Sequence, residues 1–383
     1  MPTHIGAPDF SRRVVCILGL PFDAVSLGEA VDRVCQSVLS GDRTLVSTVN
    51  VNFVVAAQRD ELFRHSVIHS ELSLADGMPI VWISRFLGMP VVERVPGSSL
   101  FKQLQSRRAD EPVRVYFFGG LPGVAERAAQ RINASKSGVR CVGFEDPGHG
   151  TAERLSSEDS IRRINAAKPD FLVVSLGAVK GQAWIERNRP ALEVPVLSHL
   201  GAVVGFEAGM VRRAPRMVQA SGFEWLWRIR EEPALWRRYL KDGKELIRLL
   251  LVSVIPLAAI RVRGLFWPVN SKAIAELNVA DNATHLTLGG MCGAGFVESF
   301  NACLRAAAEA RSDVVIDLKN VDGFDANTMG SLLLLYGHQR DIGHRLLFAG
   351  VTARIRRVFR RHCTEYLLHE QFIQPPVATA IRT

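Results

Sequence analysis

The sequence VRVYFFGGLPG at residues 113–123 joins a run of β-branched and aromatic residues to a glycine-rich turn, and an alanine-rich stretch with helical spacing follows it. Comparable strand-like runs occur at Val14–Leu18, Thr44–Val49, Phe171–Leu176 and Val194–Leu200. Strands that alternate with helices form a parallel sheet covered on both faces. We therefore predict an α/β domain whose functional residues directly follow the strands, because ligands bind beyond the carboxyl ends of such sheets.

The positive charge of the chain is concentrated in one segment. The 383 residues carry a formal charge of +9, and between residues 211 and 269 there are 12 Lys and Arg against 5 Asp and Glu. Trp225, Trp227, Trp236 and Tyr239 are interleaved with these basic residues. This mixture is typical of a helix on an anionic membrane surface, and a solvated helical face docked on the domain is the alternative. We expect no nucleic-acid partner, because the segment has no recognised DNA-binding motif.

Metal centres, disulfide frameworks and membrane-spanning helices are not expected. The six cysteines are scattered and form no CxxC pair, which argues against a zinc site and against dense disulfides. The longest mostly apolar stretch, Leu249–Ile260, has 12 residues, whereas a spanning helix needs about 20. Residues Met1–Arg13 lack the apolar region of a signal peptide. We expect a cytoplasmic protein that attaches, at most, to the inner surface of the cell membrane.

A further unit is predicted after the sequence WPVN at residues 267–270. Strand-like and helix-like segments alternate there, namely Thr284–Leu288, Gly295–Ala310, Val314–Leu318, Thr328–Tyr336 and Arg345–Ala349. About 110 residues suffice for one small α/β domain. The predicted organisation is therefore an α/β core at residues 1–210, a basic helical appendage at 211–269 and a small α/β domain at 270–383.

Polar side chains follow two of the predicted strands. Thr48 and Asn50 lie at the end of Thr44–Val49, where a hydroxyl and an amide can bind sugar or phosphate groups. A helix N-cap is the alternative role for Asn50, because the stretch Asn52–Arg64 that follows is predicted to be helical. Asp76 precedes Gly77 at a strand–turn junction, where a carboxylate can accept a proton from a substrate hydroxyl. An ordinary Asp-Gly turn is the alternative there.

Two further turns could bind phosphate. Arg94 stands beside a turn that contains Gly97, and a guanidinium binds phosphate in bidentate fashion, although a surface arginine is the alternative. Gly119 and Gly120 end a strand before a helix, where backbone N–H groups suit a nucleotide diphosphate or simply form the connecting turn. The chain contains no dinucleotide-binding GxGxxG pattern, no Walker A motif and no GxSxG motif.

Taken in order, these motifs resemble those of the WecG/TagA/CpsF glycosyltransferases. The shared motifs are Thr48-x-Asn50, Asp76-Gly77, Arg94-Val-x-Gly97, Phe117-x-Gly119-Gly120 and Leu176-Gly177-x-x-Lys180. The likeness is most specific further on, in Gly209-x-x-x-Arg213-Ala214-Pro215, Glu224-Trp225-x-x-Arg228 and Arg238-Tyr239. It covers about residues 14–245.

This resemblance implies a Rossmann-like enzyme that transfers a sugar of the N-acetylmannosamine type, or a related hexose, from a UDP-sugar donor to a polyprenyl-diphosphate-linked acceptor. The transfer inverts the anomeric centre and uses no metal or other cofactor, and it belongs to exopolysaccharide or cell-envelope glycan biosynthesis. Asp76 is the implied general base. The implied substrate-binding residues are Thr48, Asn50, Arg94, Gly97, Gly119, Gly120, Gly177 and Lys180. Those implied for the lipid and its diphosphate are Arg212, Arg213, Arg228, Arg237 and Arg238.

The chain departs from the family pattern in two places. It reads Gly177-Ala-Val-Lys180-Gly181-Gln182 where the family usually reads Gly-x-Pro-Lys-Gln-Glu, and Ser99 stands where the family often has Asp. Both departures leave the donor sugar open. They also leave an alternative function open, in which a degenerate transferase domain binds a nucleotide sugar and acts as a regulator.

Residues 272–372 resemble a STAS domain. The likeness lies in Val314-Val-Ile-Asp317-Leu, Asp325-x-x-x-Met329-Gly330 and Leu346-x-Phe-x-Gly350-Val. Regulated STAS domains have a phosphorylated serine where Asn327 stands here, so the usual kinase switch is expected to be absent, with Thr328 as a neighbouring hydroxyl. The resemblance implies a docking module for an unknown protein partner, and a purely structural appendage is the alternative. A homo-oligomer is also compatible with the sequence.

Overall fold

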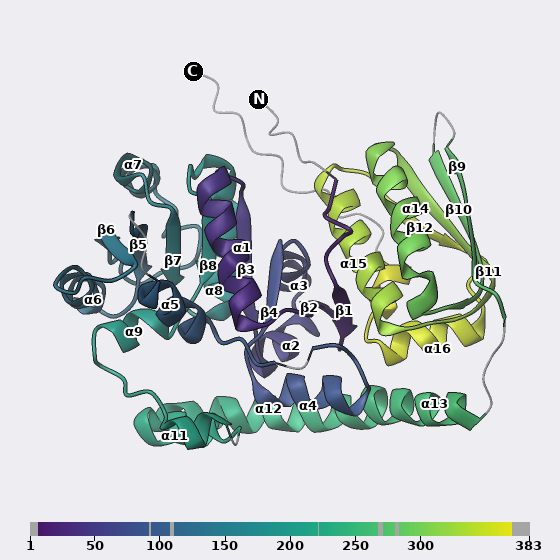
Figure 1. The fold of residues 1–383 in the computed structure, drawn as a ribbon, viewed down its shortest axis with the longest axis horizontal. Coiled ribbons are helices and arrows are strands. Elements are labelled where there is room, and N and C mark those ends of the chain that lie inside the picture. Colours follow the sequence, from purple (N-terminus) through teal and green to yellow (C-terminus); the bar gives the residue numbers. More distant parts are fainter. Residues whose placement is uncertain are drawn as a thin grey trace. The chain divides into compact units, whose positions relative to one another are not determined.

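The computed structural model describes residues 7–91, 93–107, 111–220, 222–266, 271–279 and 283–369 (Figure 1). The chain forms two compact units. One is Arg13–Ile255, and the other combines Pro256–Thr383 with Met1–Arg12. Each unit contains its own main sheet. The junction predicted at residues 267–270 lies outside the described residues.

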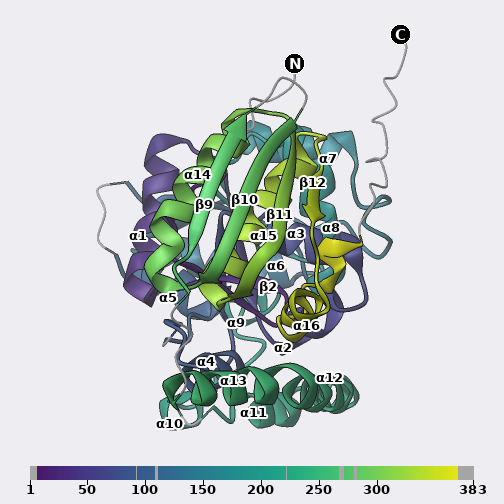
Figure 2. The ribbon, with the colours of Figure 1, turned by 90° about the vertical axis from the view of Figure 1, so that its right-hand side faces the viewer.

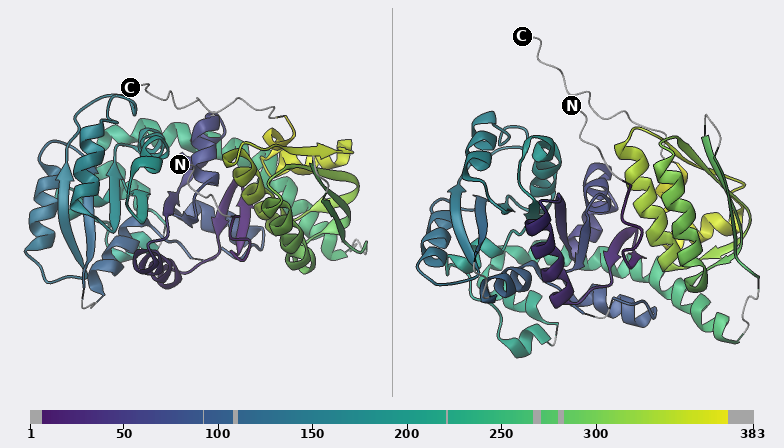
Figure 3. Two further views of the ribbon diagram at one scale, coloured as in Figure 1. Left: turned by 90° about the horizontal axis from the view of Figure 1, so that it is seen from above. Right: turned by 45° about the horizontal axis from the view of Figure 1, so that its top comes forward.

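A six-stranded parallel sheet forms the centre of the unit Arg13–Ile255 (Figure 3). Its order is β4-β3-β8-β7-β5-β6. The strands are β3 (Thr44–Val49), β4 (Leu72–Ala75), β5 (Val113–Gly119), β6 (Val139–Glu145), β7 (Phe171–Ser175) and β8 (Val196–His199). The chain runs outward from β3 to β4 and, on the other side, from β5 to β6, so the strand order reverses among the central strands. Sheets of this type bind ligands where the order reverses, beyond the carboxyl ends of the strands.

Helices cover both faces of this sheet (Figure 3). One core lies between the sheet and the helices α1 (Leu27–Ser40), α5 (Gly97–Ser106) and α6 (Val124–Asn133). The second core includes residues of α7 (Glu158–Ala167) and α8 (Ala178–Asn188). Val173 belongs to the first core and Val174 to the second, because successive strand residues point to opposite faces. The continuous apolar runs of the sequence thus mark strands buried on both sides, and the predicted α/β class is confirmed.

Two of the predicted elements differ from those observed. The run Val14–Leu18 does not join the parallel sheet, because β1 (Val14–Ile17) pairs antiparallel with β2 (Leu20–Asp23) in a separate hairpin. The tight turn between them places Gly19 at φ +84°. The predicted helical stretch from Asn52 is divided into α2 (Val51–Ala57) and α3 (Glu61–Ile68). The division occurs because the side chain of Asp60 accepts a hydrogen bond from the Phe63 N–H and caps α3.

The basic segment after residue 210 is helical, as predicted. It contains α10 (Arg216–Ala220), α11 (Glu224–Glu231) and α12 (Trp236–Leu249), which belong to the appendage predicted at residues 211–269. In this unit α12 packs on α2, where the amide nitrogen of Asn52 donates to the buried carboxylate of Asp242 at 3.1 Å. A π-helical turn (Leu250–Val254) and α13 (Ile255–Phe266) follow. Among the described helices, none combines the length and the apolar content that crossing a bilayer requires.

The second unit has a four-stranded mixed sheet (Figure 2). Its strands, in the order β12-β11-β10-β9, are Leu346–Ala349, Asp313–Phe324, Ala283–Cys292 and Ile274–Val279. Strand β9 is antiparallel to β10, and the other pairs are parallel. The helices of this unit are α14 (Val297–Glu309), α15 (Ala326–Asp341) and α16 (Ala353–Arg361). The hydroxyl of Thr328 is buried and donates to the backbone oxygen of Cys292 at 3.1 Å, so it is not presented to a kinase.

Candidate active site

Asp76 lies at the carboxyl edge of the six-stranded sheet, directly after β4. Its backbone N–H donates to the oxygen of Val49, the last residue of the neighbouring strand β3, at 2.9 Å. The backbone N–H of Gly97, the first residue of α5, donates to the Asp76 carboxylate. The side chain is therefore positioned by two strand ends and by the amino end of a helix, which is a favourable place for an anion.

Opposing influences bring the pKa of Asp76 to about 7. The largest is the withdrawal of the carboxyl group from water, although Asp76 as a residue remains partly exposed. The charge of Glu224 also raises the pKa, whereas Arg94, Arg228 and the Gly97 N–H lower it. A carboxylate with a pKa near the working pH is suited to accept a proton during catalysis.

Arg94 is held beside Asp76 by the chain that leads into α5. The backbone N–H of Val95 donates to the oxygen of Ala75 at 2.8 Å, which ties this segment to the end of β4. The Arg94 guanidinium forms a hydrogen-bonded ion pair with Glu224 of α11, and the two side chains are only 14% and 21% exposed. The appendage is thereby connected to the arginine next to Asp76.

Thr48 packs closely against Gly97, the residue whose N–H donates to Asp76. A Cβ atom at Gly97 would lie 2.4 Å from a methyl group of Leu200 and 3.1 Å from the Thr48 methyl carbon. A side chain at position 97 would require Leu200, Thr48 or the start of α5 to shift. Thr48 itself is buried. Its side chain packs against the residue that donates to the Asp76 carboxylate.

Asn50 is the N-cap of a helix, which is the structural alternative that the sequence left open. Its side-chain oxygen accepts from the Phe53 N–H at 3.2 Å and caps α2. The amide nitrogen has no hydrogen-bond partner in the part of the chain that the structure describes. The Asn50 Cβ lies 3.8 Å from the position of a Cβ at Gly77, so this amide stands next to the Asp76-Gly77 turn and keeps a donor available to a ligand.

Glycines line the edge at the neighbouring strands. Gly119 and Gly120 have φ angles of +93° and +108°, and a Cβ at Gly119 would lie 2.7 Å from the backbone oxygen of Ser175 at the end of β7. Gly177 precedes α8 with a φ of +85° and has open space around it. Lys180 lies in the first turn of α8 and forms no hydrogen bond or ion pair with described residues.

Two appendage arginines reach the site and flank one aromatic ring. The guanidinium carbons of Arg213 and Arg228 each lie 5.8 Å from the ring centroid of Phe206 in α9 (Val203–Glu207). Arg213 also donates to the hydroxyl groups of Ser98 and Ser99 at 2.9 and 3.1 Å, at the amino end of α5. The Nε atoms of both arginines are buried and unpartnered among the described residues. Each guanidinium therefore keeps an unused donor, and the charge of Arg228 also acts on Asp76.

The other three predicted arginines are not brought to Asp76. Arg237 and Arg238 lie over the neighbouring rings of Trp236 and Tyr239, at 5.6 and 5.3 Å from their centroids. The backbone oxygen of Arg212 accepts from the Trp227 indole at 3.1 Å, which fixes the fold of the appendage. These side chains belong to the surface of the appendage and not to the site around Asp76.

The altered segment 177–182 is compensated by His199. A Cβ at Gly181 would lie 2.4 Å from Nδ1 of His199, so the imidazole occupies the space that a side chain at position 181 would need. His199 is buried, and burial lowers its pKa to about 4, which keeps the ring neutral. Gln182 points into the core, where its amide nitrogen donates to the Ser47 hydroxyl at 2.6 Å. The departure from the family pattern therefore forms a packed arrangement of its own.

Residues 15–258 match the glycosyl transferase WecG/TagA/CpsF family. The chain belongs to this family. Residues 275–363 match a second family, described as Mlab, STAS domain. This glycosyltransferase thus carries a STAS domain after its catalytic unit, and both resemblances drawn from the sequence are confirmed.

The curated relatives share a quarter of the matched residues with this glycosyltransferase. A protein of Bacillus spizizenii is 27% identical over 199 residues, which is 52% of this chain and 76% of the relative. A protein of Bacillus subtilis is 26% identical over 206 residues, which is 54% of this chain and 78% of the relative. A protein of Staphylococcus aureus is 24% identical over 216 residues, which is 56% of this chain and 83% of the relative. All three are named N-acetylglucosaminyldiphosphoundecaprenol N-acetyl-beta-D-mannosaminyltransferase.

Two side chains of the site had no assigned role in the sequence argument. Glu224 was recognised only as part of a motif, and its pairing with Arg94 spans 130 residues of chain. Phe206 follows β8 and carries no motif. An aromatic residue shortly after a strand end and just before an arginine-rich segment is the one signal that could have suggested it.

Proposed function

We propose that this glycosyltransferase moves an N-acetylmannosamine-type sugar or a related hexose from a UDP-sugar to a polyprenyl-diphosphate-linked sugar, with inversion. The observation that carries the proposal is Asp76, a carboxyl group with a pKa of about 7 that stands among Arg94, Arg228 and Glu224. The names of the relatives support an acceptor with a diphosphate-linked polyprenol. The product would enter an exopolysaccharide or another cell-envelope glycan.

The proposed chemistry divides the work between Asp76 and the arginines. Asp76 accepts the proton of the acceptor hydroxyl, the hydroxyl oxygen forms a bond to the anomeric carbon, and the bond from that carbon to the UDP oxygen breaks. Negative charge then develops on the departing diphosphate. We assign its stabilisation to Arg94 and Arg228, whose charges act on Asp76, and to Arg213 at the amino end of α5, and the glycines after β5 and β7 allow the backbone to approach a nucleotide diphosphate.

The proposal is tested by Asp76→Asn in an assay with UDP-N-acetylmannosamine and a lipid-linked N-acetylglucosamine acceptor. Loss of a general base is expected to reduce kcat by about 100- to 10,000-fold. Asp159→Asn, an exposed carboxylate on α7, is the matched control. Undiminished turnover by Asp76→Asn would exclude the role given to Asp76. Binding of UDP-sugar by the wild type without turnover of any lipid-linked acceptor would instead favour the regulatory alternative.

We further propose that the enzyme works on the anionic inner surface of the cell membrane. Large apolar side chains are exposed on α4 (Met78–Phe86) and on α12, where Trp82, Phe86, Leu240 and Ile247 are 46%, 60%, 52% and 59% exposed. In both Figure 1 and Figure 2, α4, α11 and α12 lie along the same side of their unit. Apolar side chains interleaved with Arg and Lys suit a surface that inserts among lipid headgroups.

A further inference from the structure

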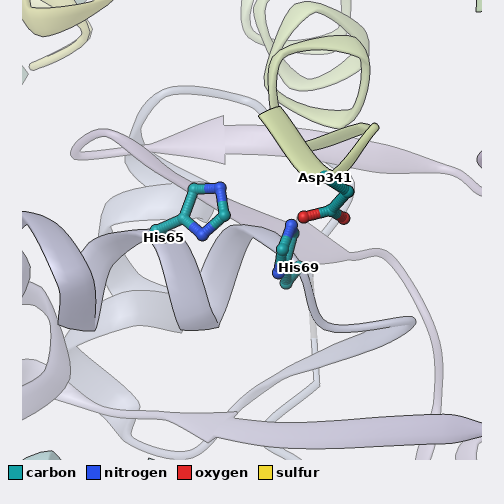
Figure 4. A group of neighbouring side chains, drawn as sticks. All are labelled: His65, His69 and Asp341. Atoms are coloured by element: carbon teal, nitrogen blue, oxygen red, sulfur yellow. The ribbon is translucent and has the colours of Figure 1, made fainter. Parts of the chain in front are cut away.

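Two features outside the active site are not explained by sugar transfer. One is the pair His65 and His69 at the end of α3, whose ring centroids are 4.0 Å apart (Figure 4). Both histidines make further interactions within the structure, so we assign no ligand to this pair. The other is the segment before β1, residues 7–12, which belongs to the compact unit of the STAS domain although the chain continues from it into the catalytic unit.

Phe10 is the buried anchor of this segment. It is 2% exposed, whereas Ala7, Asp9 and Ser11 around it are exposed. The Asp9 carboxylate accepts from the backbone N–H and the hydroxyl of Ser11, and the Arg12 N–H donates to the Asp9 backbone oxygen at 3.3 Å, which together form a tight turn. Residues 7–12 form no helix or strand. One buried aromatic side chain on a short turn is the kind of anchor with which peptides dock on domains.

Asn301 of α14 contacts the backbone of this segment. Its amide nitrogen donates to the backbone oxygen of Phe10 at 2.9 Å. The side-chain oxygen of Asn301 is buried and has no hydrogen-bond partner among the described residues. Buried polar atoms without a partner are uncommon, and an amide side chain can bind an acceptor and a donor of a peptide backbone at once. Residues 7–12 thus use one half of Asn301, and its oxygen is left for a ligand that also presents a backbone N–H.

We propose that the surface around Asn301 is a docking site of the STAS unit for a segment of a partner protein. The partner segment carries an aromatic side chain in the place of Phe10 and a backbone N–H for the oxygen of Asn301. Residues 7–12 occupy the site in cis and are displaced when the partner binds, so their contact is autoinhibitory for docking. A segment of the same chain has an effective concentration on the order of millimolar, which sets the threshold that a partner must exceed. The site contains none of the residues around Asp76, so it stands independently of the proposed transfer.

The test is fluorescence anisotropy of a labelled synthetic peptide of residues 7–13 with the full-length protein. Phe10→Ala removes the anchor and vacates the site, so this variant should bind the peptide at least about 10-fold more tightly than the wild type does. Phe144→Ala, which removes an exposed phenylalanine of β6, should bind it as weakly as the wild type. A peptide with the Phe10→Ala change should bind neither protein. Equal binding by the wild type and Phe10→Ala, or no binding by Phe10→Ala, would overturn the proposal.

Asn301→Ala, introduced together with Phe10→Ala, tests the polar contact. Loss of the hydrogen bonds of the amide should weaken peptide binding by about 5- to 10-fold relative to Phe10→Ala alone. Ser299→Ala, at an exposed position of the same helix, is the control and should leave the affinity unchanged. If Asn301→Ala also leaves it unchanged, the peptide binds elsewhere and the proposed site is wrong.

Hydrogen–deuterium exchange of the wild type gives a measurement that needs no variant. The N–H groups of Phe10 and Arg12 are hydrogen-bonded within residues 7–12, and a large excess of peptide should speed their exchange by displacing this segment. Unchanged exchange would show that the segment is a fixed part of the fold and not a displaceable one. Light scattering separates a partner protein from a second copy of this chain, because a wild-type dimer that dissociates in Phe10→Ala would mean that the site joins two copies.

Discussion

The carboxyl group of Asp76 is surrounded by influences of opposite sign, and their balance determines the pH range in which it can accept a proton. Withdrawal from water and Glu224 raise its pKa to about 7, against the lowering effects of Arg94 and Arg228. A base must be unprotonated to work, so kcat/KM should rise with pH up to about 7 and then level off. A measured profile between pH 5 and 9 shows this acidic limb directly.

Glu224→Gln should move that limb to lower pH. The substitution removes a negative charge near Asp76 and also releases Arg94 from its ion pair, and both changes favour the ionised carboxylate. Glu231→Gln on the same helix is the control, with an unchanged profile expected. If the limb of Glu224→Gln coincides with that of the wild type, Glu224 does not act on the base.

The raised pKa of Asp76 also has a consequence for stability. Its folded-state pKa of about 7 lies above the ordinary value of 3.8, so between these pH values the folded protein holds a proton that the unfolded chain lacks. The contribution of Asp76 to stability therefore falls as pH rises from about 4 to 7. Asp76→Asn should increase the free energy of unfolding at pH 8 relative to wild type more than at pH 5. Urea unfolding at both pH values measures the difference, and an equal effect at both would contradict it.

Gly97 controls how closely α5 approaches the site. In Gly97→Ala the added methyl group would meet a methyl group of Leu200 at 2.4 Å, so either the buried Leu200 side chain or the start of α5 must shift, and a shift of α5 moves the Gly97 N–H relative to Asp76. Because displacements of about 1 Å can cost up to 100-fold in rate, we expect kcat/KM to fall at least about 10-fold. Gly28→Ala in α1, where the nearest atom is 3.9 Å away, should leave turnover unchanged. Full activity of a folded Gly97→Ala would show that the close approach is not required.

At the scale of elements, the appendage has two faces with different tasks. Glu224, Arg213 and Arg228 face the active site, while Arg237 and Arg238 lie beside the exposed apolar residues of α12. One basic segment thus serves both the proposed diphosphate and the proposed membrane. The apolar stripe and the basic side chains are both readable from the sequence, but the division of the arginines between the two faces is not.

Arg237→Gln with Arg238→Gln should weaken binding to vesicles that contain anionic phospholipid. Each basic residue near such a surface contributes about 1 kcal/mol, so the double variant should bind roughly 30-fold more weakly at low salt. Lys136→Gln with Arg140→Gln removes the same charge from an exposed site elsewhere and serves as the control. Co-sedimentation measures both. Equal binding by the two double variants would mean that net charge, and not the appendage, directs the protein to the surface.

For the whole molecule, the site residues all lie within Arg13–Ile255, and the STAS domain belongs to the other compact unit. Thr328→Ala should reduce the stability of the STAS unit by about 1–3 kcal/mol, because the Cys292 carbonyl loses its partner. Turnover should remain unchanged. Chemical unfolding followed by two probes measures the stability of the STAS unit, and the transfer assay measures turnover. A loss of turnover at a temperature where the variant is folded would show that the STAS unit controls catalysis, in place of the docking role that the resemblance implies for it.

The sequence by itself determined the strands, most of the helices and the order of the motifs, because β-branched runs and helical spacing are local properties of the chain. It placed Asp76 after a strand, but left open whether Asp76 was a base or a turn residue, and it did not distinguish β1 from the parallel strands. Only the tertiary structure decided that Glu224 meets Arg94, that Arg213 and Arg228 flank Phe206, and that His199 fills the space beside Gly181. These contacts join residues that are far apart in the chain, and they depend on side-chain volume and on how closely helices approach strands, which no local pattern records.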